Sequence, residues 1–546
     1  MPADALELIK RYERMIAARS TYDSKLQEIK ELVRPNALDF NRQGYVGDSR
    51  TDKIYDGTAL WSLGQFGSWL HQSLTPASDR WYGFTIEDRE LVEDEDIKAW
   101  LELASDRTYY HYSLSEVGFQ PTVHECFLDI GSFGTAVVYQ DRDDRYFRPF
   151  FKTFPLASCY IDEGYDGKID TLFRKIMWTK RQVIQRFGEA TPSKILDDKD
   201  EDKKWHFFHA VYPRKDRDPS KYTSKNFEFA SCWVCIDLKV LVLEGGYKEF
   251  PYHVPRWTRV AGETYGRSPA WDCLPEIRMI NEMSKVVIKA AQKIVDPPLM
   301  VPDDGFILPI RTSPSSLLFY QSGTQDRIEP LETKGRVDIG MDMMDQRREQ
   351  IMKAFYVDFI RAQRKRERQT AVEIMDDRDE MTRMGAPMLG RVQQELLGPM
   401  IQRTYNLLEA AGQIPDAPMR LKQYAAQLRR EGRGALMIKY VSPAARAQSA
   451  TKIMDVQRAI QDLAPIGQVR PDIFDNLDLD EVARMIVDLR GVSNRVKRKS
   501  DDVMEIRQSR QAQMDLAQAA QVGGTAAAGI KDIALAQAAT AKAQGG

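Results

Sequence analysis

A short segment between residues 361 and 370 has the chemistry of a phosphate-binding surface. It holds five basic residues against one acidic residue, and no apolar residue follows Ala362 within it. The basic residues are Arg361, Arg364, Lys365, Arg366 and Arg368. Arg and Lys contact the DNA backbone without reading its bases, so these side chains are candidates for non-specific DNA contact. A solvated helix face or a salt-bridged strip between subunits would have the same composition, and the residues alone leave these alternatives open.

Two pairs of residues have the chemistry of zinc ligands, namely His206 with His209 and Cys232 with Cys235. Both pairs lie in short segments rich in aromatic and β-branched residues, which predict strands. Residues three apart on a strand point to opposite faces of the sheet, so a zinc site would need turns at these positions instead. We therefore expect these side chains to pack in a core, and we predict no metal site.

Two acidic clusters, at residues 93–96 and 141–144, have the chemistry of a magnesium site in a nuclease. No nearby residue supplies the base or nucleophile that such an enzyme needs, and solvated loops explain the clusters more simply. The sequence also has no G-x-x-x-x-G-K-[ST], G-x-G-x-x-G or G-x-S-x-G motif. We expect no catalytic residues, no cofactor and no enzymatic activity.

The overall charge argues against tight DNA binding. The 546 residues include 78 basic and 80 acidic side chains, a formal net charge of −2. Proteins that grip DNA usually carry a large basic excess, because phosphate neutralisation supplies most of the affinity. Any contact with DNA should therefore be local or weak.

The cysteine count and the hydropathy indicate a protein of a reducing compartment outside the membrane. The five cysteines are an odd number, which argues against a disulfide framework. The longest uncharged stretch that could suggest a membrane span, residues 516–530, is too short and too weakly apolar to cross a bilayer. We expect a soluble protein without a membrane partner.

Helical and strand patterns alternate along the chain. Apolar residues spaced by three and four predict helices at residues 1–34, 55–74 and 276–296. Residues 341–384 contain neither Pro nor Gly, but their apolar pattern fails between 363 and 370, so we predict two helices joined by the basic segment. Short aromatic and β-branched runs separated by turn formers predict strands between about 80 and 260. The expected class is α+β, mainly α.

Five local patterns, in this order and at these spacings, resemble the head-to-tail connecting (portal) protein family of short-tailed double-stranded DNA phages. They are Tyr55-Asp56-Gly57 with Leu74-Thr75-Pro76 and Arg80-Trp81; Tyr265-Gly266-Arg267-Ser268-Pro269 with Leu274-Pro275 and Asn281; Asp296-Pro297-Pro298-Leu299 with Val301-Pro302-Asp303-Asp304; Thr370-Ala371-Val372-Glu373-Ile374; and Val441-Ser442-Pro443-Ala444-Ala445-Arg446-Ala447-Gln448. Two positions depart from the family pattern, with Val372 in place of Thr and Ala444 in place of Leu. The last hundred residues match the family only in composition and helical character.

The resemblance implies a ring, usually a dodecamer, at one vertex of the capsid. Its subunit plan has an α/β wing, a two-helix stem, a small β-containing clip, a helical crown and a C-terminal helical barrel around a channel. On this sequence the plan gives a wing at 1–275, stem helices at 276–297 and 338–360 flanking a clip at 298–337, a tunnel loop at 361–370, a returning wing segment at 371–430, a crown at 431–505 and a barrel helix at 506–546. The five basic residues of the tunnel loop would then touch the DNA in the channel.

The resemblance also implies a structural function and a set of partners. Such a ring conducts DNA during genome packaging and ejection, and it docks first the terminase large subunit and later the tail. Its other partners would be the major capsid and scaffolding proteins, the tail adaptor and the internal core proteins, and its location the virion after assembly in the host cytoplasm. The alternatives are another phage structural protein, such as a tail adaptor or core component, and a metal-dependent nuclease.

Overall fold

The computed structural model describes two compact units of the chain. Unit 1 lies within Met1–Gly83, Ala104–Pro415 and Ile438–Ala444, and unit 2 within Phe84–Leu103, Asp416–Met437 and Ala445–Gly546. The residues that the structure describes are 4–41, 51–77, 80–143, 145–218, 223–295, 299–300, 329–330, 337–357, 387–430, 434–441, 458, 465, 479–489 and 502–514. Helices and strands both occur, as the sequence predicted.

The larger sheet of unit 1 is antiparallel, with its strands in the order β4-β5-β6-β7-β8. The strands are β4 (Cys159–Glu163), β5 (Ile169–Thr179), β6 (Lys204–Pro213), β7 (Phe229–Cys235) and β8 (Val240–Tyr247). One face packs on α1 (Ala5–Val33), where Tyr12 stacks on Phe208 with the ring centroids 4.9 Å apart. The other face packs on α6 (Lys180–Phe187) and α7 (Ser193–Leu196) through the neighbouring Phe207. The two cores therefore follow from the alternation of side chains along β6.

Helix α1 is fixed on the sheet by a buried arginine. The helix was predicted, and its buried stripe is formed by the residues at positions 8, 9, 12 and 15. Further along, the fully buried guanidinium of Arg19 donates to the carbonyl oxygens of Leu156 and Cys159, at 2.8 and 2.7 Å. It also pairs with Asp23 at 2.8 Å. Because an unpaired buried cation is very costly, these contacts determine where α1 lies.

A second layer of unit 1 combines helices with a small sheet of order β3-β2-β9. Its elements are α2 (Thr58–Leu74), α5 (Phe119–Phe133), α8 (Pro269–Asp272), β2 (Val137–Asp143), β3 (Arg148–Phe154) and β9 (Tyr252–His253). Helices α2 and α5 approach closely because each offers a glycine to the other. A Cβ on Gly67 would lie 2.7 Å from the Leu128 side chain, and one on Gly131 would lie 2.7 Å from Leu63.

The pattern Tyr265-Gly266-Arg267-Ser268-Pro269 serves a close crossing of two backbones. Gly134 ends α5 with a φ of 75°, and a Cβ on Gly266 would lie only 2.4 Å from the Gly134 carbonyl oxygen. Ser268 then caps α8 by accepting the N–H of Trp271 at 2.9 Å, and its hydroxyl donates to the Ser132 carbonyl at 2.8 Å. These residue types are therefore required by geometry at this crossing.

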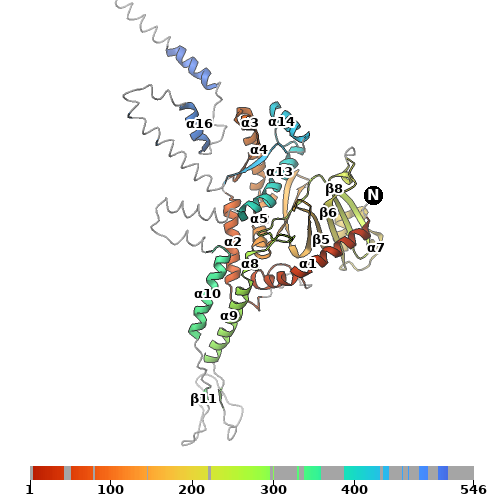
Figure 1. Cartoon of the computed structure of the whole chain (residues 1–546). Helices are drawn as coiled ribbons and strands as arrows, with labels where there is room; N and C mark the ends of the chain where they lie inside the picture. The colour runs from red at the N-terminus through yellow and green to blue at the C-terminus, as the bar shows by residue number, and fades with distance from the viewer. Residues whose placement is uncertain are drawn as a thin grey trace, which may run out of the picture. The chain divides into compact units, whose positions relative to one another are not determined.

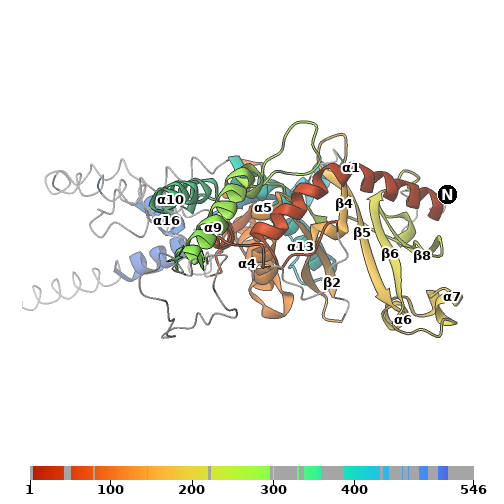
Figure 2. The same ribbon diagram turned by 90° about the horizontal axis from the view of Figure 1, so that it is seen from below.

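Two long helices, α9 (Leu274–Val295) and α10 (Val337–Ala354), lie side by side (Figures 1 and 2). Between them in sequence, the short strands β10 (Leu299–Met300) and β11 (Glu329–Pro330) pair antiparallel, and they are the part of the segment 298–336 that the structure describes. The second stem helix was expected to run to residue 360, whereas α10 ends at Ala354. Phe355 turns into the core and Tyr356 takes a left-handed φ of 59°, which stops the helix.

The remaining described elements complete the two units. In unit 1, the π-helix η5 (Gln393–Leu397) continues into α13 (Gly398–Ala410). Unit 2 contains α3 (Arg89–Glu93), α14 (Met419–Arg430) and α16 (Leu479–Leu489). Helix α4 (Glu95–Ser113), and the paired strands β1 (Tyr82–Thr85) and β12 (Met437–Tyr440), run across the boundary between the units. Within the described residues no helix is long and apolar enough to cross a membrane.

Candidate functional site

The α9–α10 pair has a specific register, set along the line where the two helices touch. The Ser284 hydroxyl donates to the Met344 sulfur at 3.4 Å. Near the body of unit 1, Arg347 pairs with Glu276 at 2.8 Å. At the opposite end a Cβ on Gly340 would lie 3.5 Å from Val287, an ordinary contact distance. These contacts fix how α9 and α10 lie against each other.

The pair is joined to the body by a set of contacts that we call the clasp, formed by Lys53, Tyr55, Asp56, Asn281 and Arg348. The Asn281 carboxamide is satisfied at both atoms: its Oδ1 accepts the Tyr55 N–H and its Nδ2 donates to the Lys53 carbonyl, each at 2.8 Å. From α10, Arg348 donates to Asp56 Oδ2 through Nη2 at 2.9 Å and Nε at 3.1 Å. Each helix therefore has its own anchor in the segment before α2.

The Asp56 carboxylate is the buried centre of the clasp, with its side chain 5% exposed. It also accepts the N–H of Thr58 at 2.9 Å, which explains why α2 begins at Thr58 and not at Tyr55 as predicted. Burial acts to raise the pKa of Asp56, but hydrogen bonds from Thr58 and Arg348 outweigh it and hold the pKa below its ordinary value. The carboxylate is therefore charged at neutral pH.

Aromatic packing fixes the end of α10 nearest the body. Phe355 is fully buried and meets Phe66 edge-on, at 6.3 Å between ring centroids. Tyr356 stacks on Trp69 of α2 at 6.0 Å and meets Trp257 at 6.1 Å. Because α10 ends in this cluster, its direction is set by both the clasp and the core.

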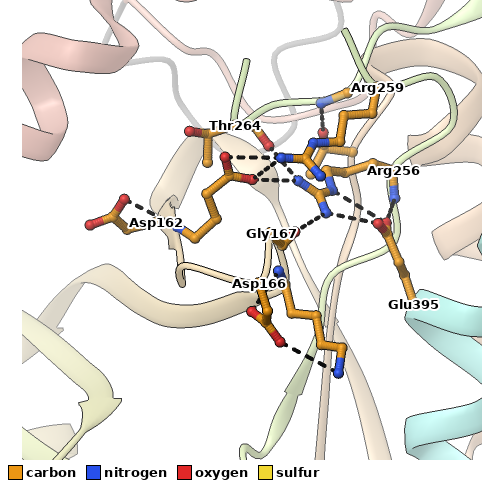
Figure 3. Close-up of polar contacts among 11 residues, drawn as sticks. Asp162, Asp166, Gly167, Arg256, Arg259, Thr264 and Glu395 are labelled. Atoms are coloured by element: carbon orange, nitrogen blue, oxygen red, sulfur yellow. Dashed lines mark hydrogen bonds and ion pairs between the residues drawn. The ribbon is translucent and has the colours of Figure 1, made fainter. Parts of the chain in front are cut away.

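A buried arginine, Arg256, holds the segment that carries Trp257 (Figure 3). Its guanidinium pairs with Glu395 of η5 at 2.8 Å and with Glu163 of β4 at 3.1 Å, and it donates to the Gly167 carbonyl at 2.9 Å. The Arg256 N–H also donates to Glu395, at 2.8 Å. One side chain that is 2% exposed thus joins β4, the β4–β5 turn and the π-helix. Arg259 adds a second ion pair to Glu163, at 3.0 Å.

The two histidines considered as zinc ligands have separate surroundings. His209 is buried between the Tyr252 and Ser231 hydroxyls, each at 2.9 Å from a ring nitrogen. Burial holds the pKa of His209 well below its ordinary value. His206 is partly exposed beside Asp237, at 3.2 Å. Each ring therefore has its own structural partner.

The two cysteines also lie apart, on opposite faces of β7. Cys232 packs in the core beneath α1, and Cys235 packs in the core beneath α6. Burial raises the pKa of the Cys232 thiol to about 11, so the thiol is protonated at neutral pH. The prediction of core packing is confirmed for Cys232, Cys235 and His209, but it is wrong for His206, which is partly exposed beside Asp237. Across the described ranges, no group of three or more His, Cys, Asp or Glu is placed to hold a metal ion.

The first acidic cluster has structural uses within unit 2. Asp94 accepts the backbone N–H of Asp96 at 3.1 Å at the start of α4, and it pairs with Arg420 of α14 at 2.8 Å. The hydrogen bond from Arg420 lowers the pKa of Asp94. Glu95 pairs with Arg484 of α16 at 2.9 Å. In the second cluster, Asp141 accepts the Tyr139 hydroxyl. The interpretation of these clusters as solvated loops was therefore too simple, because Asp94 caps α4 and both Asp94 and Glu95 form ion pairs with arginines.

All five residues proposed for the tunnel loop, Arg361, Arg364, Lys365, Arg366 and Arg368, lie outside the described residues. Asp56 and Asn281 stand in motifs that the sequence singled out, whereas the roles of Arg348, Arg256 and Glu395 were not predicted. A signal was present for Arg256, which stands in the otherwise apolar run Val254-Pro255-Arg256-Trp257. A lone charge in such a run usually has a buried partner.

Comparison with known proteins gives a consistent set of similarities. A family model described as bacteriophage head to tail connecting protein matches residues 5–497. The chain is 26% identical over 529 residues to the probable portal protein of Bordetella phage BPP-1, covering 94% of this chain and 92% of that protein. It is 26% identical over 547 residues to the portal protein of Salmonella phage epsilon15, covering 96% and 94%. The portal protein of Escherichia phage T7 is 23% identical over 426 residues, covering 74% and 75%.

Replacing Asp56 tests the clasp. Asp56→Asn should lower the free energy of unfolding by about 1–3 kcal/mol at pH 7, because it removes a charge-assisted hydrogen bond to a buried carboxylate. The pKa of Asp56 is lowered on folding, so its contribution exists above the ordinary carboxyl pKa of about 4 and is lost as the pH falls through the folded value. Denaturant titrations at pH values from 7 down to about 3 should therefore show that the free energies of unfolding of Asp56→Asn and wild type become more similar as the pH falls.

The matched control is Asp345→Asn, which removes the other carboxylate bonded to Arg348. The Asp345 side chain is 67% exposed, so its loss should cost less than about 1 kcal/mol. An equal effect of the two substitutions, or a difference that does not change with pH, would contradict the role of Asp56.

Replacing Glu395 tests the Arg256 network. Glu395→Ala should lower the free energy of unfolding by about 3 kcal/mol, because it leaves a buried guanidinium short of one partner. Denaturant unfolding measures this change, with Gln394→Ala as the control on the exposed side of the same π-helix. The control should stay within about 0.5 kcal/mol of wild type. Equal stabilities of the two variants would rule out a structural role for the pair.

Proposed function

The chain belongs to the bacteriophage head-to-tail connecting protein family, and we propose that its copies close into a ring, a dodecamer by the family plan, around a channel for double-stranded DNA. As a member of this family the chain is a structural connector at the portal vertex of the phage capsid, and it is not an enzyme. In the proposed function the ring passes DNA inward during packaging and outward during ejection. The energy for packaging comes from a separate terminase ATPase, because this sequence has no phosphate-binding loop.

The main support for the proposed ring is that the anchored helix pair has exposed apolar side chains on its outer side. On α9, Val286 is 61% exposed and Met279 44%, and on α10 Met341 is 54% exposed. A helix that points away from its body with apolar residues on its outer side usually packs against a partner. Identical contacts repeated from copy to copy close into a ring when the rotation between neighbours closes.

The domain plan of the family gives each segment a place in the proposed ring. Helices α9 and α10 would be the stem, and the two sheets of unit 1 with their covering helices the wing. The clip at 298–337 would face the packaging motor and later the tail. The crown at 431–505 and the barrel at 506–546 would extend the channel into the capsid.

Residues 361–370 would be the tunnel loop, where Arg361, Arg364, Lys365, Arg366 and Arg368 touch the DNA backbone. Support for this comes from the contrast between the basic segment and a chain whose net charge is −2. A channel that bound phosphate along its whole length would hold the DNA, since each neutralised phosphate adds affinity. If only residues 361–370, which we call the basic collar, touch the phosphates and the rest of the channel wall is near neutral, the DNA can be contacted and can still slide.

The remaining partners follow from the position of the ring. The terminase large subunit would dock on the clip during packaging, and the tail adaptor would replace it afterwards. The wing would meet the major capsid and scaffolding proteins, and the internal core proteins would stack on the inner end. A tail adaptor or core protein would have a different position in the virion, and the two-helix stem favours the portal.

Imaging the purified chain tests the proposed ring directly. Negative-stain class averages should contain rings whose central pore is wide enough for a DNA duplex. Twelvefold rings support the dodecamer, and a neighbouring subunit number would still support the ring. Discrete monomers or dimers at high concentration would contradict it.

Removing the basic collar tests the tunnel loop. The change Arg364→Ala with Lys365→Ala, Arg366→Ala and Arg368→Ala should leave the ring intact and weaken DNA binding by the ring at low salt. The logarithm of the binding constant should fall less steeply with the logarithm of salt, by about 0.9 for each phosphate that the collar no longer neutralises. Heads assembled with this variant should also retain less DNA.

The control replaces four exposed lysines on or beside β5, β6 and α7 with Ala, namely Lys175, Lys194, Lys199 and Lys215. It changes the net charge of the chain equally but leaves the collar untouched. If both variants bind DNA with the wild-type salt dependence and fill heads normally, the collar has no role in DNA contact.

A further inference from the structure

The two helices of the pair carry opposite charges on their outer sides. On α9, Lys285, Lys289 and Lys293 follow one another at four-residue spacing, which brings them to neighbouring positions on one side of a helix. On α10, Asp342, Asp345 and Glu349 recur at spacings of three and four. The outer side of α9 is thus mainly basic, with Glu282 beside Lys285, and the outer side of α10 is mainly acidic, with Lys353 one turn beyond Glu349.

These charges point away from the line where α9 and α10 touch. On α9 that line contains Ser284, and Lys293, nine residues further on, projects to the opposite side at about 100° per residue. On α10 the contact line contains Met344. Asp342, two residues before Met344, lies about 160° round the helix and so projects away from α9. The basic flank and the acidic flank therefore lie on opposite sides of the pair.

The outermost charges have no partner within the part of the chain that the structure describes. Lys285 is near Glu282 and Tyr55, and Asp345 bonds to Arg348. Lys289, Lys293, Asp342 and Glu349 are exposed, and none of them forms an ion pair or hydrogen bond with a described residue. On the basic flank, the exposed Val286 and Met279 lie beside the lysines.

We propose that the basic flank of α9 in one copy docks on the acidic flank of α10 in the next copy, with Lys289 and Lys293 facing Asp342 and Glu349. This inference rests on the proposed ring and names the surface by which it closes. The contact is head-to-tail, because two different flanks meet and each copy keeps one free flank for a further neighbour. Val286 and Met279 are covered in the same contact.

A second copy of this chain fits both flanks, whereas DNA fits only one. A duplex would be attracted by the lysines but repelled by the carboxylates of α10. A separate acidic partner would explain the α9 flank alone. Only a neighbour with the same pair of helices presents an acidic surface to the basic flank and a basic surface to the acidic one.

The test uses two charge-reversed forms of the full chain. The α9 variant carries Lys289→Glu with Lys293→Glu, and the α10 variant carries Asp342→Lys with Glu349→Lys. Each alone would place like charges against one another at every contact, so ring formation should require at least a tenfold higher concentration than wild type. Mixed in equal amounts, the two should assemble into rings again, because alternating copies restore opposite charges at every contact.

Rings at the wild-type concentration from either variant alone, or no recovery on mixing of the two folded variants, would overturn the proposed contact. A wild-type chain that never forms rings would instead overturn the proposed function itself. The control, Lys194→Glu with Lys199→Glu, reverses two exposed lysines on and beside α7 and should assemble as wild type does.

Should a reversed variant fail to fold by circular dichroism, the milder change Lys289→Gln with Lys293→Gln provides a second measurement. It should raise the concentration for half-assembly several-fold at low salt and make assembly less sensitive to added salt. An unchanged half-assembly concentration and salt dependence would overturn the contact.

Discussion

The ion pair between the buried Asp56 carboxylate and the partly exposed guanidinium of Arg348 is the contact on which the position of the helix pair depends. Helices α9 and α10 touch the body only near one end, so a small rotation there would move their far ends by many ångströms. A carboxylate that is 5% exposed, and is bonded in fixed geometry to Arg348 and to the N-terminus of α2, strongly opposes such a rotation. Asn281 does the same for α9 with an uncharged side chain, so the anchorage uses both helices.

The clasp in turn rests on a body held together by buried arginines. Arg256 fixes the segment whose next residue, Trp257, packs on Phe66 and Tyr356 at the end of α10. Arg19 fixes α1 on the sheet in the same manner, by donating to backbone carbonyls. Replacing a buried ion pair by apolar residues can leave the stability of a protein unchanged. The contribution of these buried arginines is therefore specificity, because a guanidinium accepts only one arrangement of its partners. In a proposed ring, where an error in one subunit is repeated in every contact, a unique arrangement matters more than stability.

The sequence predicted the elements of this fold better than their ends or their contacts. The long helices and the strands between about 80 and 260 follow from apolar spacing, which is a local property. The start of α2 at Thr58 and the end of α10 at Ala354 depend on Asp56, Arg348, Trp69 and Trp257, which meet only in the folded chain. Family resemblance singled out Asp56 and Asn281 as positions without giving their partners. Arg256 and Glu395 are 139 residues apart, and no spacing rule connects them.

A reconstruction of the assembled ring by electron cryomicroscopy, at a resolution that places side chains, would show directly whether the helix pairs line the channel and join neighbouring subunits. We expect the helix pairs to surround the pore, each set on its body through Asp56 and Arg348, with Lys293 of one subunit nearest the acidic flank of the next. Helix pairs that point away from the pore, or an α9 flank that faces solvent while the ring closes through other surfaces, would contradict this expectation.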